Sequence, residues 1–90
     1  MKVRVKYLAV INSVTGKYEE DIEVNEGENI AGLVERLANI YGQRFRDVVY
    51  TFGGPRRYFV NFYHNGQLAS PETILSSGDE VILLLALGGG

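Results

Sequence analysis

Cysteine is absent from this sequence, and histidine occurs once, as His64. Without cysteine the chain has no disulfide, no thiolate metal ligand, no iron–sulfur cluster and no cysteine nucleophile. With one histidine it has no multi-histidine metal site, and any histidine-dependent catalysis must use His64. Because the redox compartment of a protein is inferred from its cysteines, this sequence does not indicate the compartment.

The sequence also lacks a basic surplus and a long apolar run. Nine Lys and Arg against eleven Asp and Glu give a net charge of −2, whereas nucleic-acid-binding proteins usually carry a basic excess. The longest apolar run, residues 81–87, is shorter than the ~20 residues of a membrane-spanning helix. Alternating charged and apolar residues at 2–6 do not resemble a signal peptide. We therefore expect a cytoplasmic protein that binds neither nucleic acid nor membrane.

The composition that remains is globular, with 46% hydrophobic and 22% charged residues. Ninety residues suffice for one domain, so we expect a single domain over residues 1–90. A chain of this length has one modest core and no deep substrate cleft.

The first part of the chain predicts a β-hairpin. Residues 2–11 and 18–25 alternate between apolar and polar with period two, and residues 12–16 have turn composition. Opposed charges and apolar residues favour one register. That register places three pairs opposite each other: Val5 and Ile22, Arg4 and Glu23, Lys6 and Asp21.

An amphipathic helix is predicted over residues 30–41, with Asn29 as its N-cap and Gly42 as the residue that stops it. After this helix the sequence predicts, in order, an irregular loop at 43–57 with a short strand at 48–52, a strand at 58–63, a tight turn at 65–66, one helical turn at 71–75, and a strand at 80–87. The last strand is apolar on both faces, which predicts a place in the centre of a sheet. The fold class is α+β, with one main helix on one face of a mixed sheet of four to five strands.

The alternation assigns residues to the two faces of this sheet. The expected core residues are Val3, Val5, Ile22, Val24, Leu33, Val34, Leu37, Val60 and Phe62. Asn61, Phe59 and Tyr63 should then face away from the helix, together with alternate residues of the last strand. An exposed apolar patch of this kind usually marks an interaction site, so Phe59 and Tyr63 are candidate partner-binding residues.

Three other features could carry chemistry, and each has a simpler interpretation. His64 lies beside the 65–66 turn without a nucleophile motif near it, as expected for a partly exposed turn residue. The segment 53–57 lacks the spacing of a phosphate-binding loop. It reads as a surface turn, in which Arg56 and Arg57 could contact an acidic partner. The acidic residues of 19–28 lack calcium-loop spacing and read as a solvated strand face. No catalytic residue and no metal ligand is therefore assigned.

Three glycines, Gly88, Gly89 and Gly90, end the sequence. One interpretation is a frayed terminus, because glycine has the largest backbone freedom and adds nothing to a core. The other is a tail without Cβ atoms that threads a narrow channel and presents its α-carboxylate, which is ionised at neutral pH with a pKa near ~3.5. Composition does not decide between the two.

The order of elements, the Ser77-Gly78-Asp79-Glu80-Val81 turn and strand, and the Gly89-Gly90 pair together resemble the β-grasp sulfur carriers. The resemblance spans nearly the whole chain and is greatest to MoaD-like small subunits of molybdopterin synthase. The resemblance implies a ubiquitin-like β-grasp fold and a flexible tail at 88–90. It also implies that the Gly90 carboxylate is adenylated and then converted to a thiocarboxylate for molybdenum cofactor biosynthesis.

In this family the carrier is a co-substrate and not an enzyme, and it holds no permanent cofactor. The implied partners are a ubiquitin-activating-type adenylating enzyme that uses ATP and magnesium, a sulfur donor enzyme, and the large subunit of molybdopterin synthase. Two departures leave the branch open: residues 83–87 contain no proline, and residues 43–57 are long and basic. The alternatives are a ubiquitin-like protein modifier, a tRNA-thiolation carrier, and a β-grasp interaction module without tail chemistry.

Overall fold

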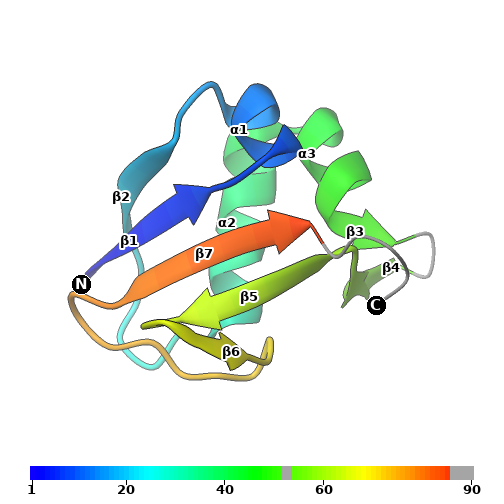
Figure 1. Ribbon diagram of the computed structural model, residues 1–90. Coiled ribbons are helices and arrows are strands. Elements are labelled where there is room, and N and C mark those ends of the chain that lie inside the picture. Colours follow the sequence, from blue (N-terminus) through cyan, green and yellow to red (C-terminus); the bar gives the residue numbers. More distant parts are fainter. Residues whose placement is uncertain (52–53, 86–90) are drawn as a thin grey trace.

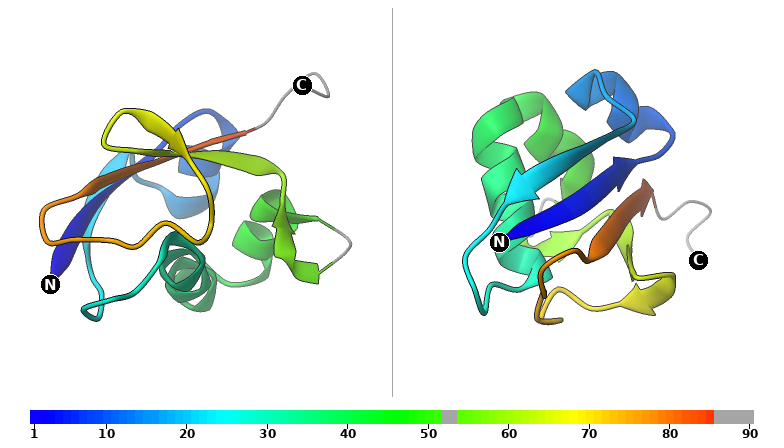
Figure 2. Two further views of the ribbon diagram at one scale, coloured as in Figure 1. Left: turned by 90° about the horizontal axis from the view of Figure 1, so that it is seen from below. Right: turned by 90° about the vertical axis from the view of Figure 1, so that its left-hand side faces the viewer.

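A computed structural model describes residues 1–51 and 54–85 and has the predicted α+β architecture (Figure 1). Its elements in order are β1 (Lys2–Tyr7), α1 (Val10–Thr15), β2 (Glu19–Glu23), α2 (Ile30–Tyr41), α3 (Gln43–Val49), β3 (Tyr50–Thr51), β4 (Gly54–Tyr58), β5 (Val60–His64), β6 (Gln67–Ala69) and β7 (Glu80–Leu85). A five-stranded mixed sheet has the order β2-β1-β7-β5-β6, and β3 and β4 form a separate pair. In the edge-on view of Figure 2, α2 and α3 lie on one side of the large sheet.

Strand β7 occupies the centre of the sheet, as its two apolar faces predict. It runs parallel to β1, with Val5 beside Val81, and antiparallel to β5, with Phe62 beside Leu83. Val81 and Leu83 are fully buried beneath the helices, whereas Ile82 and Leu84 lie on the opposite face. The C-terminal half of the chain thus supplies the strand on which the rest of the sheet is built.

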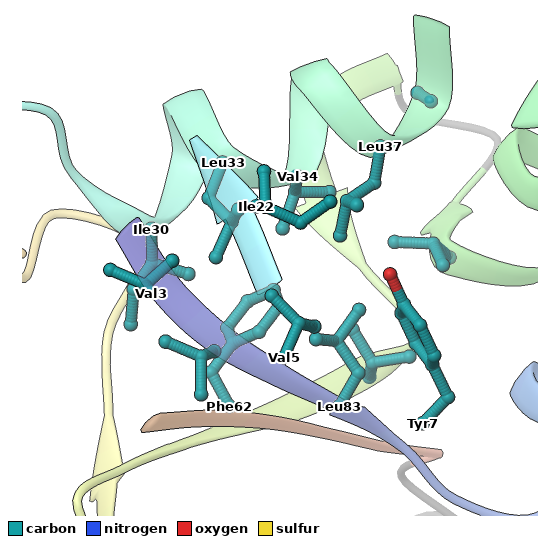
Figure 3. Packing of buried hydrophobic residues seen from close by; sticks show 14 of the residues in the cluster. Val3, Val5, Tyr7, Ile22, Ile30, Leu33, Val34, Leu37, Phe62 and Leu83 are labelled. Carbon is teal, nitrogen blue, oxygen red and sulfur yellow. The ribbon is translucent and has the colours of Figure 1, made fainter. Parts of the chain in front are cut away.

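Helix α2 has the predicted bounds and ends. The Asn29 side chain accepts a hydrogen bond from the Gly32 N–H at 2.8 Å, and Gly42 follows the helix with a φ of 82°. One stripe of the helix packs on the sheet (Figure 3), and every core residue predicted from the alternation is buried. Those residues are Val3, Val5, Ile22, Val24, Leu33, Val34, Leu37, Val60 and Phe62.

The predicted hairpin register is wrong by two residues. Val3, and not Val5, lies opposite Ile22, while Arg4 pairs with Asp21 and Lys6 with Glu19. A shift of two residues keeps every side chain on its predicted face, because the period of a strand is two. Hydrophobic alternation therefore left both registers open, and the connection between the strands decided the pairing. Tyr18, which the alternation of residues 18–25 places on the same face as Ile22 and Val24, is 77% exposed.

The connection between β1 and β2 contains helix α1, where the sequence predicted a turn at residues 12–16. Strand β1 ends at Tyr7, and α1 follows after a turn in which the Ile11 N–H donates to the Leu8 carbonyl. Ala9 occupies the first central position of this turn with φ 55° and ψ −132°, the conformation that a type II′ turn requires and that glycine favours. A non-glycine residue in such a region is strained by about 1–3 kcal/mol.

Ala9→Gly is therefore expected to raise the free energy of unfolding by about 1 kcal/mol, because relief of strain exceeds the extra chain entropy of glycine. Urea unfolding of the variant measures the change. Ala31→Gly is the matched control, since Ala31 lies in α2 with helical geometry and its replacement should destabilise by about 0.5–1 kcal/mol. Destabilisation by both substitutions would contradict the assignment of strain to Ala9.

Three further segments correct the sequence interpretation. The region at 43–57, expected as a loop with a short strand at 48–52, forms α3 and then the β3–β4 pair. The strand expected at 58–63 begins at Val60, and Tyr58 belongs to β4. The helical turn expected at 71–75 is instead a turn followed by an isolated bridge between Asn29 and Ile74. The tight turn at 65–66 is confirmed, with φ of 50° at Asn65 and 86° at Gly66.

Glu20 joins the hairpin to helix α2. Its carboxylate accepts a hydrogen bond from the Tyr7 hydroxyl at 2.6 Å, another from the Tyr41 hydroxyl, and a third from Lys17 Nζ at 3.1 Å. Burial raises the pKa of this carboxyl, but the three hydrogen bonds outweigh burial and hold its pKa below the ordinary value. Burial, followed by the hydrogen bond to Glu20 and its negative charge, raises the pKa of Tyr7.

Because the pKa of Glu20 is lower in the folded chain than in the unfolded chain, its contribution to stability is present above about pH 4.3, the ordinary value for Glu. That contribution is lost as the pH falls through the folded pKa. We expect the wild type to lose more stability than Glu20→Gln between neutral pH and about pH 3. Urea unfolding of both proteins across this range is the measurement, and parallel pH curves would show that Glu20 does not contribute.

Candidate partner interface and tail junction

The end of β7 fixes the place from which the glycine tail continues. Leu85 lies opposite Val60, the first residue of β5, and the Leu83 carbonyl accepts a hydrogen bond from the Leu8 N–H at 3.3 Å. Residues 86–90 therefore continue from the end of the sheet that carries the β1–α1 turn and the β4–β5 junction. The predicted tail residues Gly88, Gly89 and Gly90 lie outside the described part of the chain.

Three partly exposed apolar residues come from the segments at this end of the sheet, and we call them the tail collar: Leu8, Val10 and Phe59. They are 40%, 43% and 40% exposed respectively. Leu8 lies between β1 and α1, and Val10 is the first residue of α1. Phe59 precedes Val60, the β5 residue that lies beside Leu85. Sequence reasoning missed Leu8 and Val10, because it continued the first strand to residue 11.

A second apolar group lies on the face of the sheet that turns away from α2, and we call it the outer patch: Tyr63, Leu68, Ile82 and Leu84. Tyr63 is the register neighbour of both Ile82 and Leu68, so a continuous row crosses β7, β5 and β6. Leu68 is 67% exposed, and the others are half-buried. The predicted patch is thus present at Tyr63. Phe59 is not part of strand β5, since it lies at the bend after β4 and its N–H donates to the Val49 carbonyl.

The other half of the same face is charged. Arg4 binds Asp21 through Nε at 2.6 Å and also binds Glu19, while Lys6 Nζ lies 3.0 Å from Glu80. The hydrogen bonds and charges of Asp21 and Glu19 raise the pKa of Arg4, which stays a cation at every accessible pH. Glu19, Asp21 and Glu23 of β2 thus form a solvated face, as predicted, whereas Glu20 is half-buried on the other face. Strand β1 separates these three residues from the outer patch.

His64 has a structural role. Its Nε2 lies 2.6 Å from Asp79 Oδ2, and the same carboxylate accepts the Ser76 N–H at 2.8 Å and the Asn65 amide at 3.1 Å. Burial raises the pKa of Asp79, but these bonds outweigh burial and lower the pKa overall. The cluster joins the β5–β6 turn to the start of β7, at the end of the sheet remote from Leu85.

Arg56 and Arg57, the other predicted partner-binding residues, belong neither to the tail collar nor to the outer patch. Arg57 is exposed in β4, and the side chain of Arg56 lies outside the described part of the chain, as does Gly53. Within residues 1–51 and 54–85, no three His, Asp or Glu side chains gather closely enough to hold a metal ion. None of the helices in these ranges has the length and hydrophobicity to cross a membrane.

Known structures share this fold. The chain is 32% identical to the putative molybdopterin converting factor subunit 1 from Pyrococcus furiosus, with a TM-score of 0.79 over 93% of this chain and 95% of that one. SAMP1 from Haloferax volcanii superposes with a TM-score of 0.83 over the full length of both chains at 21% identity. Urm1 from Trypanosoma brucei gives 0.77 at 20% identity, over 99% of this chain and 95% of that one. No curated protein sequence matches the chain.

The sheet order, the packed helix and these neighbours define a ubiquitin-like β-grasp protein. Residues 5–90 match the ThiS family, and the chain belongs to it. Members of this group are small sulfur carriers and modifiers, and not enzymes.

Proposed function

We propose that this protein is a sulfur carrier for molybdopterin biosynthesis, and that Gly90 is the residue that carries the sulfur. The observation that supports the proposal most directly is the family match, which extends through residue 90 and so includes the Gly89-Gly90 pair. The 32% identity to a molybdopterin converting factor subunit supports the choice of pathway.

The proposed chemistry belongs to the terminal carboxylate. One carboxylate oxygen of Gly90 attacks the α-phosphorus of ATP, pyrophosphate leaves, and an acyl-adenylate forms. A hydrosulfide equivalent from a donor enzyme then attacks the acyl carbon, the bond from this carbon to the AMP oxygen breaks, and AMP leaves to give a thiocarboxylate. The adenylating enzyme uses ATP and magnesium, and this chain supplies the terminal carboxylate on its glycine tail. The carrier is therefore a co-substrate, and the folded domain presents the glycine tail to the partner.

The architecture suits this role because β7 is fixed on both sides. The hydrogen-bonded ladder with β1 holds it up to Leu83, and the ladder with β5 holds it up to Leu85. The last residues therefore start from a rigid base that a partner can recognise. Docking through the outer patch and the tail collar would place the start of the tail at the mouth of a partner's active site. We propose that the adenylating enzyme and the large subunit of molybdopterin synthase dock here.

Incubation with the cognate activating enzyme, ATP, magnesium and a sulfur source tests the chemistry. We expect ATP–pyrophosphate exchange that depends on the carrier, followed by the mass change for replacement of one oxygen by sulfur. The thiocarboxylate should then convert the pterin precursor when the large synthase subunit is added. Isopeptide conjugates without sulfur transfer would favour the modifier alternative, and absence of adenylation would favour a binding module.

The docking surface has its own prediction. Ile82→Asp, at the centre of the outer patch, should weaken binding to the activating enzyme at least tenfold, because it places a charge in a desolvated contact. Ile74→Asp is the matched control, since Ile74 is 58% exposed and lies outside the patch. Titration calorimetry measures affinity, and circular dichroism checks the fold. Equal affinities of the two variants would contradict docking through the outer patch.

A further inference from the structure

Strand β2 forms an open edge of the large sheet (Figure 1). The Tyr7 N–H donates to the Tyr18 carbonyl and the Val24 N–H donates to the Met1 carbonyl, each at 2.8 Å. In an antiparallel pair, hydrogen-bonded residues alternate with residues whose backbone groups point outward. Within β2 the outward-pointing residues are therefore Glu19, Asp21 and Glu23. In the described part of the chain, no strand lies beyond them.

A groove runs beside this edge, between β2 and helix α2. It has a volume of about 420 Å³ and is lined by Asp21, Ile22, Glu23, Arg36, Asn39 and Ile40. Ile22 forms its floor at 8% exposure, while Ile40 is 59% exposed on the flank of the helix. Arg36 is held by Glu28 through two hydrogen bonds, of 2.6 and 2.8 Å, so its side chain is ordered along the helix. An open strand edge and an apolar groove thus lie next to each other.

Exposed edges are templates for another strand, and many proteins bind extended peptides in this way. A strand added to β2 would turn every second side chain toward the groove. The residue opposite Ile22 would face Ile40, and its neighbours on either side would face the carboxylates of Asp21 and Glu23. The favoured sequence is therefore apolar at the middle position and basic on both sides.

Strand β1 provides an internal example of this complementarity. On the other side of β2 it presents Val3 to Ile22 and Arg4 to Asp21, and Arg4 binds that carboxylate at 2.6 Å. A second copy of this chain is a poor occupant, because antiparallel pairing of two β2 strands would bring acidic side chains together. Charge thus favours a different partner, with the chemistry of β1.

We propose that the β2 edge and its groove bind an extended segment of a partner protein with alternating basic and apolar residues. The segment adds a strand to the sheet, its apolar side chain contacts Ile22 and Ile40, and its basic side chains contact Asp21 and Glu23. This site lies on the opposite edge of the sheet from Leu68, and β1 separates it from β7. Binding there is independent of sulfur transfer, so either proposal can fail without the other.

The test is a titration of the isotope-labelled full chain with the capped peptide Lys-Val-Arg-Val-Lys, followed by NMR. We expect saturable shifts of the backbone amides of Glu19, Asp21 and Glu23, and slower hydrogen exchange at these amides. Amides of Tyr63 and Ile82 should not move. Shifts centred on the outer patch, or no saturable binding at millimolar peptide, would overturn the proposal.

Two variants separate specific binding from attraction between opposite charges. Ile40→Asp should weaken peptide binding at least tenfold, whereas Ile74→Asp, at an equally exposed isoleucine, should leave it unchanged. Glu23→Lys should weaken binding of the basic peptide and strengthen binding of Glu-Val-Glu-Val-Glu. Ile40, Ile74 and Glu23 are all exposed, so we expect each variant to fold, and a melting curve checks this. Equal binding by the Ile40 and Ile74 variants would overturn the role of the groove.

Discussion

Deletion of Gly90 is expected to abolish adenylation while the melting temperature stays the same. The proposed reaction needs a carboxylate on a chain that reaches past Leu85 into a partner's active site, and a shorter tail withdraws that group. Glycine has no side chain to bury, so the loss of Gly90 should not change stability. ATP–pyrophosphate exchange measures the first effect, and thermal denaturation measures the second. Full activity of the Gly90 deletion, which still ends in two glycines, would contradict the need for a tail of this length. Full activity after deletion of both Gly89 and Gly90 would refute the carrier proposal.

Gly89→Val should block transfer as completely as the deletion. A β-branched side chain restricts the backbone and fills a channel that a glycine passes freely. Gly88→Ala is the control, because the family pattern requires only the last two glycines, and it should retain most of the activity. Mass measurement for the sulfur-for-oxygen replacement distinguishes the variants. Equal loss in both would assign the effect to general stiffening of the tail.

Phe45→Ala is expected to lower the free energy of unfolding by about 3–5 kcal/mol. Phe45 is fully buried in α3 and stacks on Tyr41, with ring centroids 6.0 Å apart. Tyr41 in turn meets Tyr7 edge to face at 6.3 Å. Loss of the Phe45 ring leaves a cavity between α2, α3 and the sheet. The helices on both sides are held in place, so they do not close this cavity.

Arg44→Ala is the matched control in the same helix, because Arg44 is exposed, and the expected change is within ±0.5 kcal/mol. Urea unfolding at neutral pH gives both values. A small effect of Phe45→Ala would mean that α3 packs loosely on the rest of the core. This segment was expected to be a loop, so the measurement also tests whether α3 belongs to the folded core.

The candidate site was predictable in part. Alternation in the last two long strands placed Tyr63 on the outer face, and the register with Ile82 and Leu68 confirms that a continuous patch forms there. Phe59 was assigned to the same strand by simple continuation, but the chain bends before Val60. The bend depends on the β3–β4 pair, whose contacts are not encoded in a period of two. The place of Leu8 in the tail collar was also not predictable from alternation. It depends on where β1 ends, and the strained turn at Ala9 sets that end.

The sequence by itself determined the elements with a strong periodic signal and local ends. Helix α2 is specified by its apolar stripe, the Asn29 cap and Gly42, and the central position of β7 is specified by apolar residues on both faces. These signals are local, and tertiary packing reinforces them. The hairpin register and helix α3 were decided only by the tertiary structure. A two-residue shift leaves the faces unchanged, so the α1 connection and the Glu20 contacts to Tyr7 and Tyr41 select the pairing. Helix α3 has few local signals, and burial of Phe45 and Val49 against the sheet and α2 stabilises it.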